Sequence, residues 1–249
     1  MLNVDIKNIT IKTNSGIRVL LSDIKFNIVE NNIYTILGKN GSGKSTLIKS
    51  ITRLLNEERY IIDGKVFWFD KNIFEMNTSE MLQLRKNDIK YVLQDLTNNF
   101  DPLKKIKYYF DKYSINENVI GIKLKEFLLP DYQTISNLHS YEISGGMAQR
   151  LSFMLAILTN PKLLILDEPT SAIDYVNMNL MKIKLKNFIE DGSSVLVVTQ
   201  DINFAKEISD KISFMYDNKL SEFVEPEDFF KDAYQKPYNK FLQSFNEFQ

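Results

Sequence analysis

The chain of 249 residues contains no cysteine, so it can form neither a disulfide framework nor a metal site built from thiolates. No apolar stretch reaches the roughly 18 residues that suggest a membrane span. The first residues carry neither the basic segment nor the apolar run of a secretory signal peptide. The formal net charge is only −1, whereas nucleic-acid binding needs concentrated positive charge. We therefore expect a cytosolic globular protein whose main partner is not nucleic acid.

The most informative segment that is present is a glycine-rich run at residues 38–46, Gly-Lys-Asn-Gly-Ser-Gly-Lys-Ser-Thr. It fits the phosphate-binding loop pattern G-x-x-x-x-G-K-[ST]. Residues 33–37 before it are apolar and partly β-branched, which predicts a strand, and residues 47–51 after it read as a helix. The alternative is a glycine-rich turn with a chance lysine, and the strand–loop–helix context argues against it. The sequence therefore predicts a nucleotide-binding protein.

The residue types in this loop explain how it would hold a nucleotide. Glycines let main-chain N–H groups converge on one point, and the following helix N-terminus adds partial positive charge, so together they bind the β-phosphate. We expect Lys44 to reach the β- and γ-phosphates and the Ser45 hydroxyl to ligate Mg²⁺. The predicted nucleotide-binding residues of the loop are Gly38, Asn40, Gly41, Ser42, Gly43, Lys44, Ser45 and Thr46.

Alternating strands predict a small antiparallel sheet beside the nucleotide site. Residues 4–11 and 24–28 alternate apolar and polar side chains, and residues 65–69 form a third run after a predicted turn at Asp63 and Gly64. Such alternation is typical of strands with one buried face.

Near-continuous apolar strands predict a parallel sheet covered on both faces. They lie at residues 89–93, 163–166 and 195–199, and helical patterns alternate with them, as around Leu180. The predicted fold class is α/β: a P-loop NTPase (RecA-like) core with a small antiparallel β subdomain and a helical insertion.

We expect one domain over residues 1–249. Residues 100–145 are rich in lysine, tyrosine and asparagine and are predicted to form a helical insertion. The tail at residues 226–249 carries aromatic side chains at helical spacing, which predicts a terminal helix that packs back on the core.

Two carboxylates follow the apolar run at residues 163–166. In a P-loop enzyme, a carboxylate at the C-terminal edge of a strand lies beside the phosphate loop and can hold Mg²⁺, and Asp167 is the candidate. The adjacent Glu168 would point at the γ-phosphate and could polarise the attacking water as a general base. A strand that simply ends in polar residues is the alternative, which would be preferred if the phosphate loop were missing.

A Ser-Gly-Gly segment precedes an apolar helix shortly before these carboxylates. Ser144 reads as an N-cap, and Gly145 and Gly146 leave main-chain N–H groups open to an anion. By itself this segment is weak evidence for function.

Six elements in this order make the chain resemble the nucleotide-binding domain of ABC transporters over nearly its whole length. Ser144, Gly145 and Gly146 resemble the family's signature motif, and residues 171–174 resemble its D-loop. The full set is the phosphate loop, Gln94, the signature segment, Asp167 with Glu168, the D-loop segment, and Thr199-Gln200-Asp201.

Several segments resemble one branch of that family, the dipeptide/oligopeptide/nickel importers. They are the Q-loop at residues 94–102, residues 129–131 ahead of the signature, and residues 235–242 in the tail. Met147, where most signatures carry glutamine, resembles one of the two ATPase subunits of these importers. The cysteine cluster that some members carry is absent.

The resemblance implies an ATPase that uses ATP and Mg²⁺ and works as a dimer with a second ABC ATPase subunit, which we expect to be a different chain. Each ATP would lie between the phosphate loop of one subunit and Ser144, Gly145 and Gly146 of the other. Glu168, Gln200 and Gln94 would be the catalytic group, and the Mg²⁺ ligands would be Ser45, Gln94 and Asp167.

The resemblance also implies partners in the membrane. Two integral membrane permease subunits would dock near Gln94, and an extracytoplasmic substrate-binding protein would act through them. The chain would then lie at the cytoplasmic face of the membrane.

Two positions depart from the family pattern. Family members carry histidine at Gln200, and a glutamine amide can donate a hydrogen bond but cannot carry a proton or a charge. The only histidine, His139, lies ahead of the signature and cannot substitute. Because of Gln200, the chain's own site is predicted to be impaired, and its signature segment would serve a more active site on a different subunit.

The second departure lies near the adenine. The aromatic residue that usually stacks on the base is missing near Asn14 and Ser15, so base stacking is expected to be weak or supplied from elsewhere.

Two alternatives to an import ATPase remain open. One is a nucleotide-binding regulatory subunit that barely hydrolyses ATP, which Gln200 would suit. The other is a soluble ABC protein acting on ribosomes or in DNA repair, which is disfavoured because such chains usually carry tandem domains or long insertions.

Overall fold

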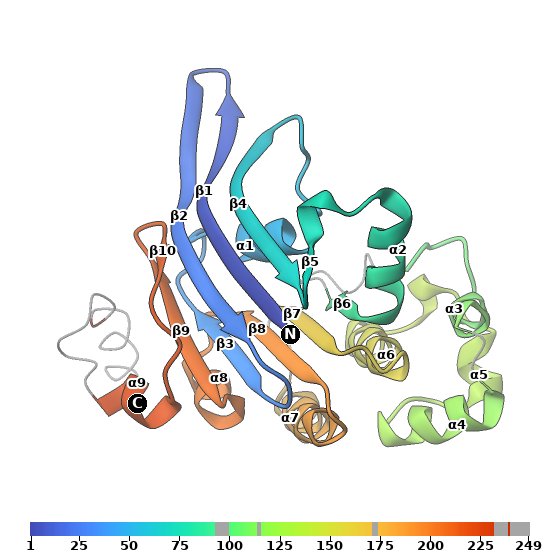
Figure 1. The fold of residues 1–249 in the computed structure, drawn as a ribbon. Coiled ribbons are helices and arrows are strands. Elements are labelled where there is room, and N and C mark those ends of the chain that lie inside the picture. The colour runs from blue at the N-terminus through green and yellow to red at the C-terminus, as the bar shows by residue number, and fades with distance from the viewer. Residues whose placement is uncertain (93–99, 114–115, 171–173, 232–238, 240–249) are drawn as a thin grey trace.

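The computed structural model describes residues 1–92, 100–113, 116–170, 174–231 and 239 and contains two sheets with helices around them (Figure 1). One sheet has the strand order β2–β1–β4–β5, and the other has the order β10–β9–β3–β8–β7–β6. All pairs in the second sheet are parallel except that between β9 and β10. This is the predicted α/β arrangement of a parallel core beside a small antiparallel sheet.

The parallel sheet forms the centre of the molecule. Its strands are β3 (Ile33–Leu37), β6 (Ile89–Val92), β7 (Leu163–Asp167), β8 (Ser194–Thr199), β9 (Lys211–Tyr216) and the short antiparallel β10 (Lys219–Leu220). Every residue of β3, β7 and β8 is buried, which confirms that the continuous apolar runs mark strands covered on both faces. Leu37 pairs with Thr199, and Asp167 pairs with Val198. The three strands therefore end at the same edge of the sheet.

The antiparallel sheet consists of β1 (Leu2–Thr13), β2 (Gly16–Ile28), β4 (Tyr60–Trp68) and β5 (Lys71–Asn72). Its buried apolar side chains pack with those of helix α1 (Lys44–Ile51) and of β3 in one cluster. All three predicted strands are present, although Phe69 lies outside β4 and has a positive φ of 50°. Helix α1, which follows the phosphate loop, thus packs against side chains of both sheets.

The turn predicted at Asp63 and Gly64 is wrong, because both residues lie inside β4. Gly64 has a φ of +154° and lies opposite Ile6, where the register between β1 and β4 shifts. A Cβ on Gly64 would lie 2.5 Å from the main-chain oxygen of Asp5 and 2.5 Å from Cα of Ile6. This glycine permits the close approach of two strands and does not reverse the chain.

Replacing Gly64 with alanine is expected to lower the free energy of unfolding by about 2 kcal/mol or more, because the new Cβ must displace the main chain of β1. Urea denaturation measures this change. The matched control is Gly121→Ala in helix α4 (Glu117–Glu126), where nothing lies within 4 Å of the added Cβ. That control is expected to raise the free energy of unfolding by about 0.5–1 kcal/mol. Two equal, small effects would contradict the close approach.

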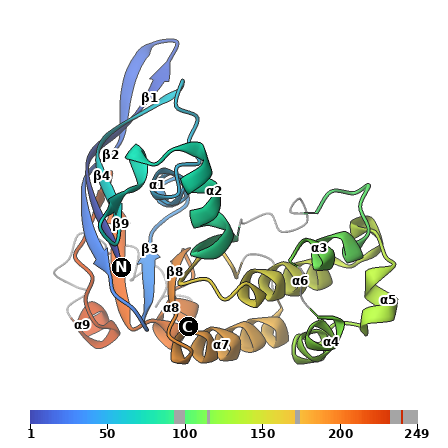
Figure 2. The same cartoon turned by 45° about the vertical axis from the view of Figure 1, so that its right-hand side comes forward.

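Helices cover the face of the parallel sheet that points away from the antiparallel sheet, and they extend to one side of the parallel sheet (Figure 2). The helical segment between residues 100 and 145 contains α3 (Ile106–Lys112), α4, α5 (Tyr132–Ser136) and a 3₁₀ turn at Ser140–Glu142. Next to the sheet lie α6 (Gly145–Leu158), α7 (Tyr175–Glu190) and α8 (Ile202–Ile208), while 3₁₀ turn Ile73–Glu75 and α2 (Thr78–Asn87) follow β5.

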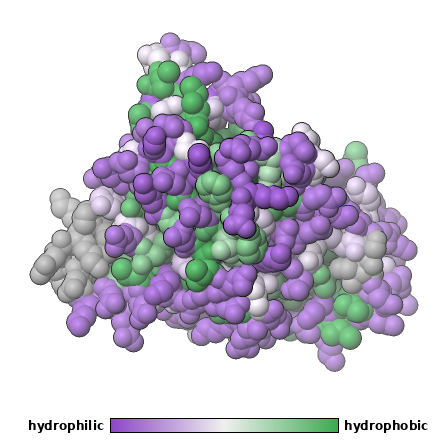
Figure 3. Space-filling view, viewed as in Figure 1, coloured by the Kyte–Doolittle hydropathy of each residue, from purple (hydrophilic) through white to green (hydrophobic). Residues whose placement is uncertain are grey.

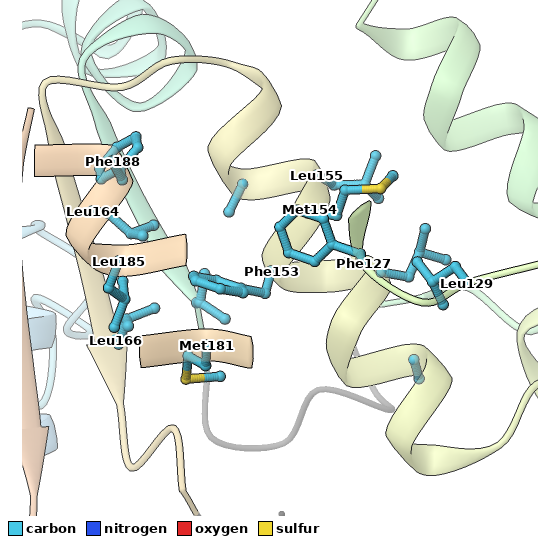
Figure 4. Packing of buried hydrophobic residues seen from close by; sticks show 14 of the residues in the cluster. Phe127, Leu129, Phe153, Met154, Leu155, Leu164, Leu166, Met181, Leu185 and Phe188 are labelled. Carbon is cyan, nitrogen blue, oxygen red and sulfur yellow. The ribbon is translucent and has the colours of Figure 1, made fainter. Parts of the chain in front are cut away.

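One apolar cluster joins the helical segment to the core (Figure 4). It runs from Leu164 and Leu166 on β7, through Phe153 on α6, to Phe127 and Leu129 after α4. The rings of Phe127 and Phe153 meet edge to face at a centroid distance of 5.7 Å. The predicted helical insertion is therefore packed on the helix that carries the Ser-Gly-Gly segment.

The last described helix is α9 (Pro226–Lys231), whose Phe229 is fully buried in a cluster with Ile212 and Phe214 of β9. Apart from residue 239, the remainder of the predicted tail helix lies outside the described residues. On the face drawn in Figure 3 polar side chains dominate, and apolar ones gather near the tip of the β1–β2 hairpin. Within the described ranges, no helix is long and apolar enough to cross a membrane.

Candidate nucleotide and magnesium site

The glycine-rich loop joins the end of β3 to the start of α1, as predicted. Gly41 and Gly43 have positive φ angles of 78° and 105°. A Cβ on Gly43 would lie 2.7 Å from a side-chain carbon of Leu21, so the loop is pressed against β2. The Oγ of Ser42 is buried, and it has no hydrogen-bond partner among the described residues. A buried donor left unpaired inside a glycine-rich loop at a helix N-terminus suits a phosphate oxygen.

Lys44 is buried and points back into this loop. Its Nζ donates to the main-chain oxygens of Gly38 and Lys39 at 2.7 and 3.1 Å. The same Nζ lies 3.0 Å from Oε1 of Glu168, with the two side chains only 5% and 9% exposed. The pair is held by charge attraction, since its geometry leaves Oε1 without an aligned hydrogen bond. The predicted phosphate-binding lysine and the predicted general base are therefore in direct contact.

Ser45 and Asp167 lie together although they are 122 residues apart in the sequence. The Ser45 hydroxyl donates to Oδ1 of Asp167 at 3.0 Å, and the Tyr91 hydroxyl donates to Oδ2 at 2.8 Å. Burial, and then the negative charge of Asp167, raise the pKa of Tyr91 well above its usual range, so the phenol stays a neutral donor. The sequence alone does not identify Tyr91 as a neighbour of Asp167, because strand periodicity places its backbone but does not show what its hydroxyl reaches.

The carboxylate of Glu168 is fixed by the end of β8. Its Oε2 accepts hydrogen bonds from the Thr199 hydroxyl and from the main-chain N–H of Gln200, both at 3.1 Å. The backbone of Glu168 has a φ of +48°, which is uncommon for a residue other than glycine, and its N–H donates to the main-chain oxygen of Val198 at 2.8 Å. Backbone strain at a residue whose side chain is held by several hydrogen bonds is typical of functional positions.

The side chain of Gln200 is exposed, and its main-chain N–H donates to Glu168. The predicted Q-loop residue Gln94, and residues 171–173 of the predicted D-loop, lie outside the described residues. The structure therefore brings together the loop, Asp167 and Glu168, with Thr199 and Tyr91 as added neighbours.

Ser144 caps α6 as predicted, with its Oγ accepting a hydrogen bond from the N–H of Met147 at 3.2 Å. Across the part of the chain that the structure describes, neither Ser144 nor the two glycines form a hydrogen bond or ion pair with the phosphate loop. Gly146 instead lies against Asn177 of α7, since a Cβ on it would be 3.4 Å from Nδ2. Ser144 and Gly145 are exposed, and Gly146 is half-buried.

Asn177 ties this segment to α7. Its Oδ1 accepts from Nη1 of Arg150 at 2.6 Å, and its Nδ2 donates to Asp174 at 2.7 Å. Gln149 also donates to the main-chain oxygen of Pro169 at 3.3 Å. The start of α6 is therefore braced against the residues that follow Glu168.

The oxygen atoms of Ser45 and Asp167 fit the ligand preference of Mg²⁺. Mg²⁺ prefers hard oxygen ligands and is commonly bound through one or two carboxylates, with water and substrate phosphates in the remaining positions. The Ser45 hydroxyl and the Asp167 carboxylate supply two such oxygens 3.0 Å apart, beside the loop that would hold the phosphates.

A family model described as ABC transporter matches residues 21–171, which span the phosphate loop, the Ser-Gly-Gly segment and both carboxylates. The chain belongs to the ABC transporter family. The ATPase activity predicted from the sequence is the activity of the ATP-binding cassettes of this family. Membership of the family confirms that prediction.

The relatives of this ABC chain include several import proteins. It is 31% identical to the dipeptide transport ATP-binding protein DppD of Caldanaerobacter subterraneus subsp. tengcongensis, over 88% of this chain and 70% of that protein. It is 32% identical to the phosphate import ATP-binding protein PstB of Saccharolobus solfataricus, over 83% and 82%. It is 28% identical to the metal-staphylopine import system ATP-binding protein CntD of Staphylococcus aureus, over 87% and 83%. The resemblance to the peptide and metal importer branch is confirmed, while the phosphate relative leaves the cargo undecided.

A solved structure of similar fold is that of the ATP-binding cassette MJ0796, described as a dimeric post-hydrolysis state bound to ADP and Pi. It matches with a TM-score of 0.73 at 27% identity, covering 91% of this chain and 99% of that chain. The predicted fold class of the ABC chain is thereby confirmed.

Proposed function

We propose that this chain is the ATP-hydrolysing subunit that powers an importer for peptides, nickel or metal chelates. The observation that carries the proposal is a pair of contacts between the end of the phosphate loop and the end of β7. Lys44 contacts Glu168, and Ser45 contacts Asp167. One basic group, one hydroxyl and two carboxylates thus surround a loop shaped for phosphate. That set matches what phosphoryl transfer to water requires.

In this proposal Lys44 exchanges its contacts with Gly38, Lys39 and Glu168 for the β- and γ-phosphates of ATP. When bound, Mg²⁺ would neutralise charge on the phosphate oxygens, and Ser45 and Asp167 would hold it together with Gln94. Glu168 would act as general base through Oε1, because Oε2 is already occupied by Thr199 and Gln200. A proton taken from the attacking water would then reside on Oε1.

The proposal includes an arrangement of the chain as one cassette over residues 1–249. Residues 100–145 would be a helical signature subdomain and residues 226–249 a C-terminal helical tail. Ser144, Gly145 and Gly146 would complete the ATP site of a second ABC ATPase subunit, since they make no polar contact to this chain's own loop within the described residues. The dimeric state of the MJ0796 cassette supports such a pairing.

The same proposal places the chain at the cytoplasmic face of the membrane. There it would dock on two integral membrane permease subunits and act with an extracytoplasmic substrate-binding protein. The dipeptide and metal-staphylopine relatives support a peptide or metal-chelate cargo. Affinity purification of the tagged full chain from detergent-solubilised membranes tests this: two permeases should co-purify, and adding cargo with its binding protein should raise ATP hydrolysis. Purification without any integral membrane protein would contradict it.

A second candidate is a regulatory subunit that binds ATP and hydrolyses it weakly, and the observation that favours it is Gln200 in place of histidine. If the amide limits this chain's own site, Gln200→His should raise its turnover by about 10²- to 10³-fold, the size of effect expected for a contact aimed at the transition state. Steady-state ATPase measurements on the assembled complex detect the gain. The matched control is Gln83→His on α2, which should change nothing. An unchanged rate for Gln200→His would count heavily against an impaired site.

A further inference from the structure

Tyr91 occupies one oxygen of the carboxylate that is proposed to hold Mg²⁺. It lies on β6 and pairs with Ile165 of β7, two residues before Asp167. Its hydroxyl donates to Oδ2 of Asp167 at 2.8 Å while Ser45 donates to Oδ1 at 3.0 Å. Both carboxylate oxygens are therefore held, each from a different element of the fold.

The two contacts restrict rotation of the carboxylate. Asp167 is only 4% exposed, so water cannot readily replace a lost donor on Oδ2. With Tyr91 in place, Oδ1 remains on the side of Ser45 and the phosphate loop. Partners of this kind, which orient a metal-binding group without touching the metal, commonly set the affinity of a metal site.

The ring of Tyr91 has a separate packing role. It packs against the buried apolar cluster that contains Ile89 of β6, Ile165 of β7 and Leu47 of α1. Phenylalanine at this position would preserve this packing and remove only the hydroxyl. The substitution Tyr91→Phe therefore separates the packing role of the ring from the hydrogen bond of the hydroxyl.

We propose that Tyr91 is a positioning residue that holds Asp167 in the orientation needed to bind Mg²⁺ with a nucleotide. The inference rests on the proposed role of Asp167 and goes beyond it by assigning a function to a residue of the neighbouring strand.

The test measures nucleotide binding, which does not require hydrolysis. A fluorescent, non-hydrolysable ATP analogue is titrated into the full-length chain across a range of Mg²⁺ concentrations, and also in EDTA. Tyr91→Phe is expected to raise the Mg²⁺ concentration at half-maximal binding by about 10-fold, and to leave the affinity in EDTA unchanged. The matched control is Tyr34→Phe: Tyr34 is 5% exposed, and its hydroxyl accepts from the N–H of Val29 at 3.2 Å. That control should follow the wild-type Mg²⁺ curve.

Three outcomes would overturn the inference. If Tyr91→Phe and the wild-type chain show the same Mg²⁺ curve, the hydroxyl does not position the carboxylate, and the proposed function stands. If Tyr91→Phe loses affinity equally in EDTA and in Mg²⁺, the hydroxyl supports the fold of the loop instead. If the wild-type affinity for the nucleotide does not depend on Mg²⁺, the proposed role of Asp167 is wrong. This inference, which rests on that role, is then wrong as well.

Discussion

Replacing Glu168 with glutamine is expected to lower ATP hydrolysis by about 10²- to 10⁴-fold, the usual contribution of a general base. Glutamine can keep the contacts of Oε2 with Thr199 and Gln200, but it cannot accept the proton from water. It also removes the charge that holds Lys44, so ATP binding should be retained or strengthened. Phosphate release and equilibrium ATP binding, measured on the same assembled complex, separate the two effects.

The matched control for this experiment is Glu57→Gln. Glu57 also pairs with a basic residue, Arg53, but its side chain is 74% exposed. Its replacement should leave both hydrolysis and binding unchanged. Undiminished turnover in Glu168→Gln would contradict the assignment of the base and would favour the weakly hydrolysing regulatory subunit.

Replacing Lys44 with methionine is expected both to weaken ATP binding and to destabilise the fold by about 3–5 kcal/mol, because Glu168 would be left as an unpaired buried charge. The two side chains of this ion pair are only 5% and 9% exposed. The double variant Lys44→Met with Glu168→Gln should recover most of the lost stability while still failing to bind ATP normally. Urea denaturation of the two single variants and the double variant measures the coupling.

The control for this cycle is the exposed pair of Lys211 and Glu225, whose side chains are 35% and 66% exposed. Lys211→Met should change the free energy of unfolding by at most about 1 kcal/mol, since exposed ion pairs contribute little. If Lys44→Met were no more destabilising than Lys211→Met, the pair with Glu168 would not be a desolvated contact of the folded protein.

The sequence predicted most of the parallel core because burial on both faces leaves a direct trace in it. β3, β7 and β8 read as continuous apolar runs, and each is buried throughout. The sequence predicts a turn at Gly64 where the structure has a close approach of two strands, because glycine serves turns and strand contacts equally well and only the partner strand distinguishes them. No strand was predicted at residues 211–216, although they form β9 beside β3.

The sequence predicts which segments form the candidate site, but it predicts few of the side-chain contacts within the site. The phosphate loop and the carboxylates after β7 follow from motif and strand end, and the parallel order then places Ser45 beside Asp167. The contact between Lys44 at the start of α1 and Glu168, and that between Tyr91 on β6 and Asp167 on β7, depend on side-chain orientation, which hydrophobic periodicity does not encode. The switch position shows the same limit: Gln200 meets Glu168 through its main-chain N–H, a contact available to any residue except proline.

In the proposed mechanism, two ABC cassettes enclose ATP between the phosphate loop of one and the Ser-Gly-Gly segment of the other. Sedimentation velocity can detect this pairing on the Glu168→Gln chain mixed with the ATPase subunit that co-purifies with it, with and without ATP. We predict a dimer that appears only with ATP and is lost when the chain also carries Ser144→Arg. Species that sediment as separate subunits at saturating ATP would contradict the mechanism.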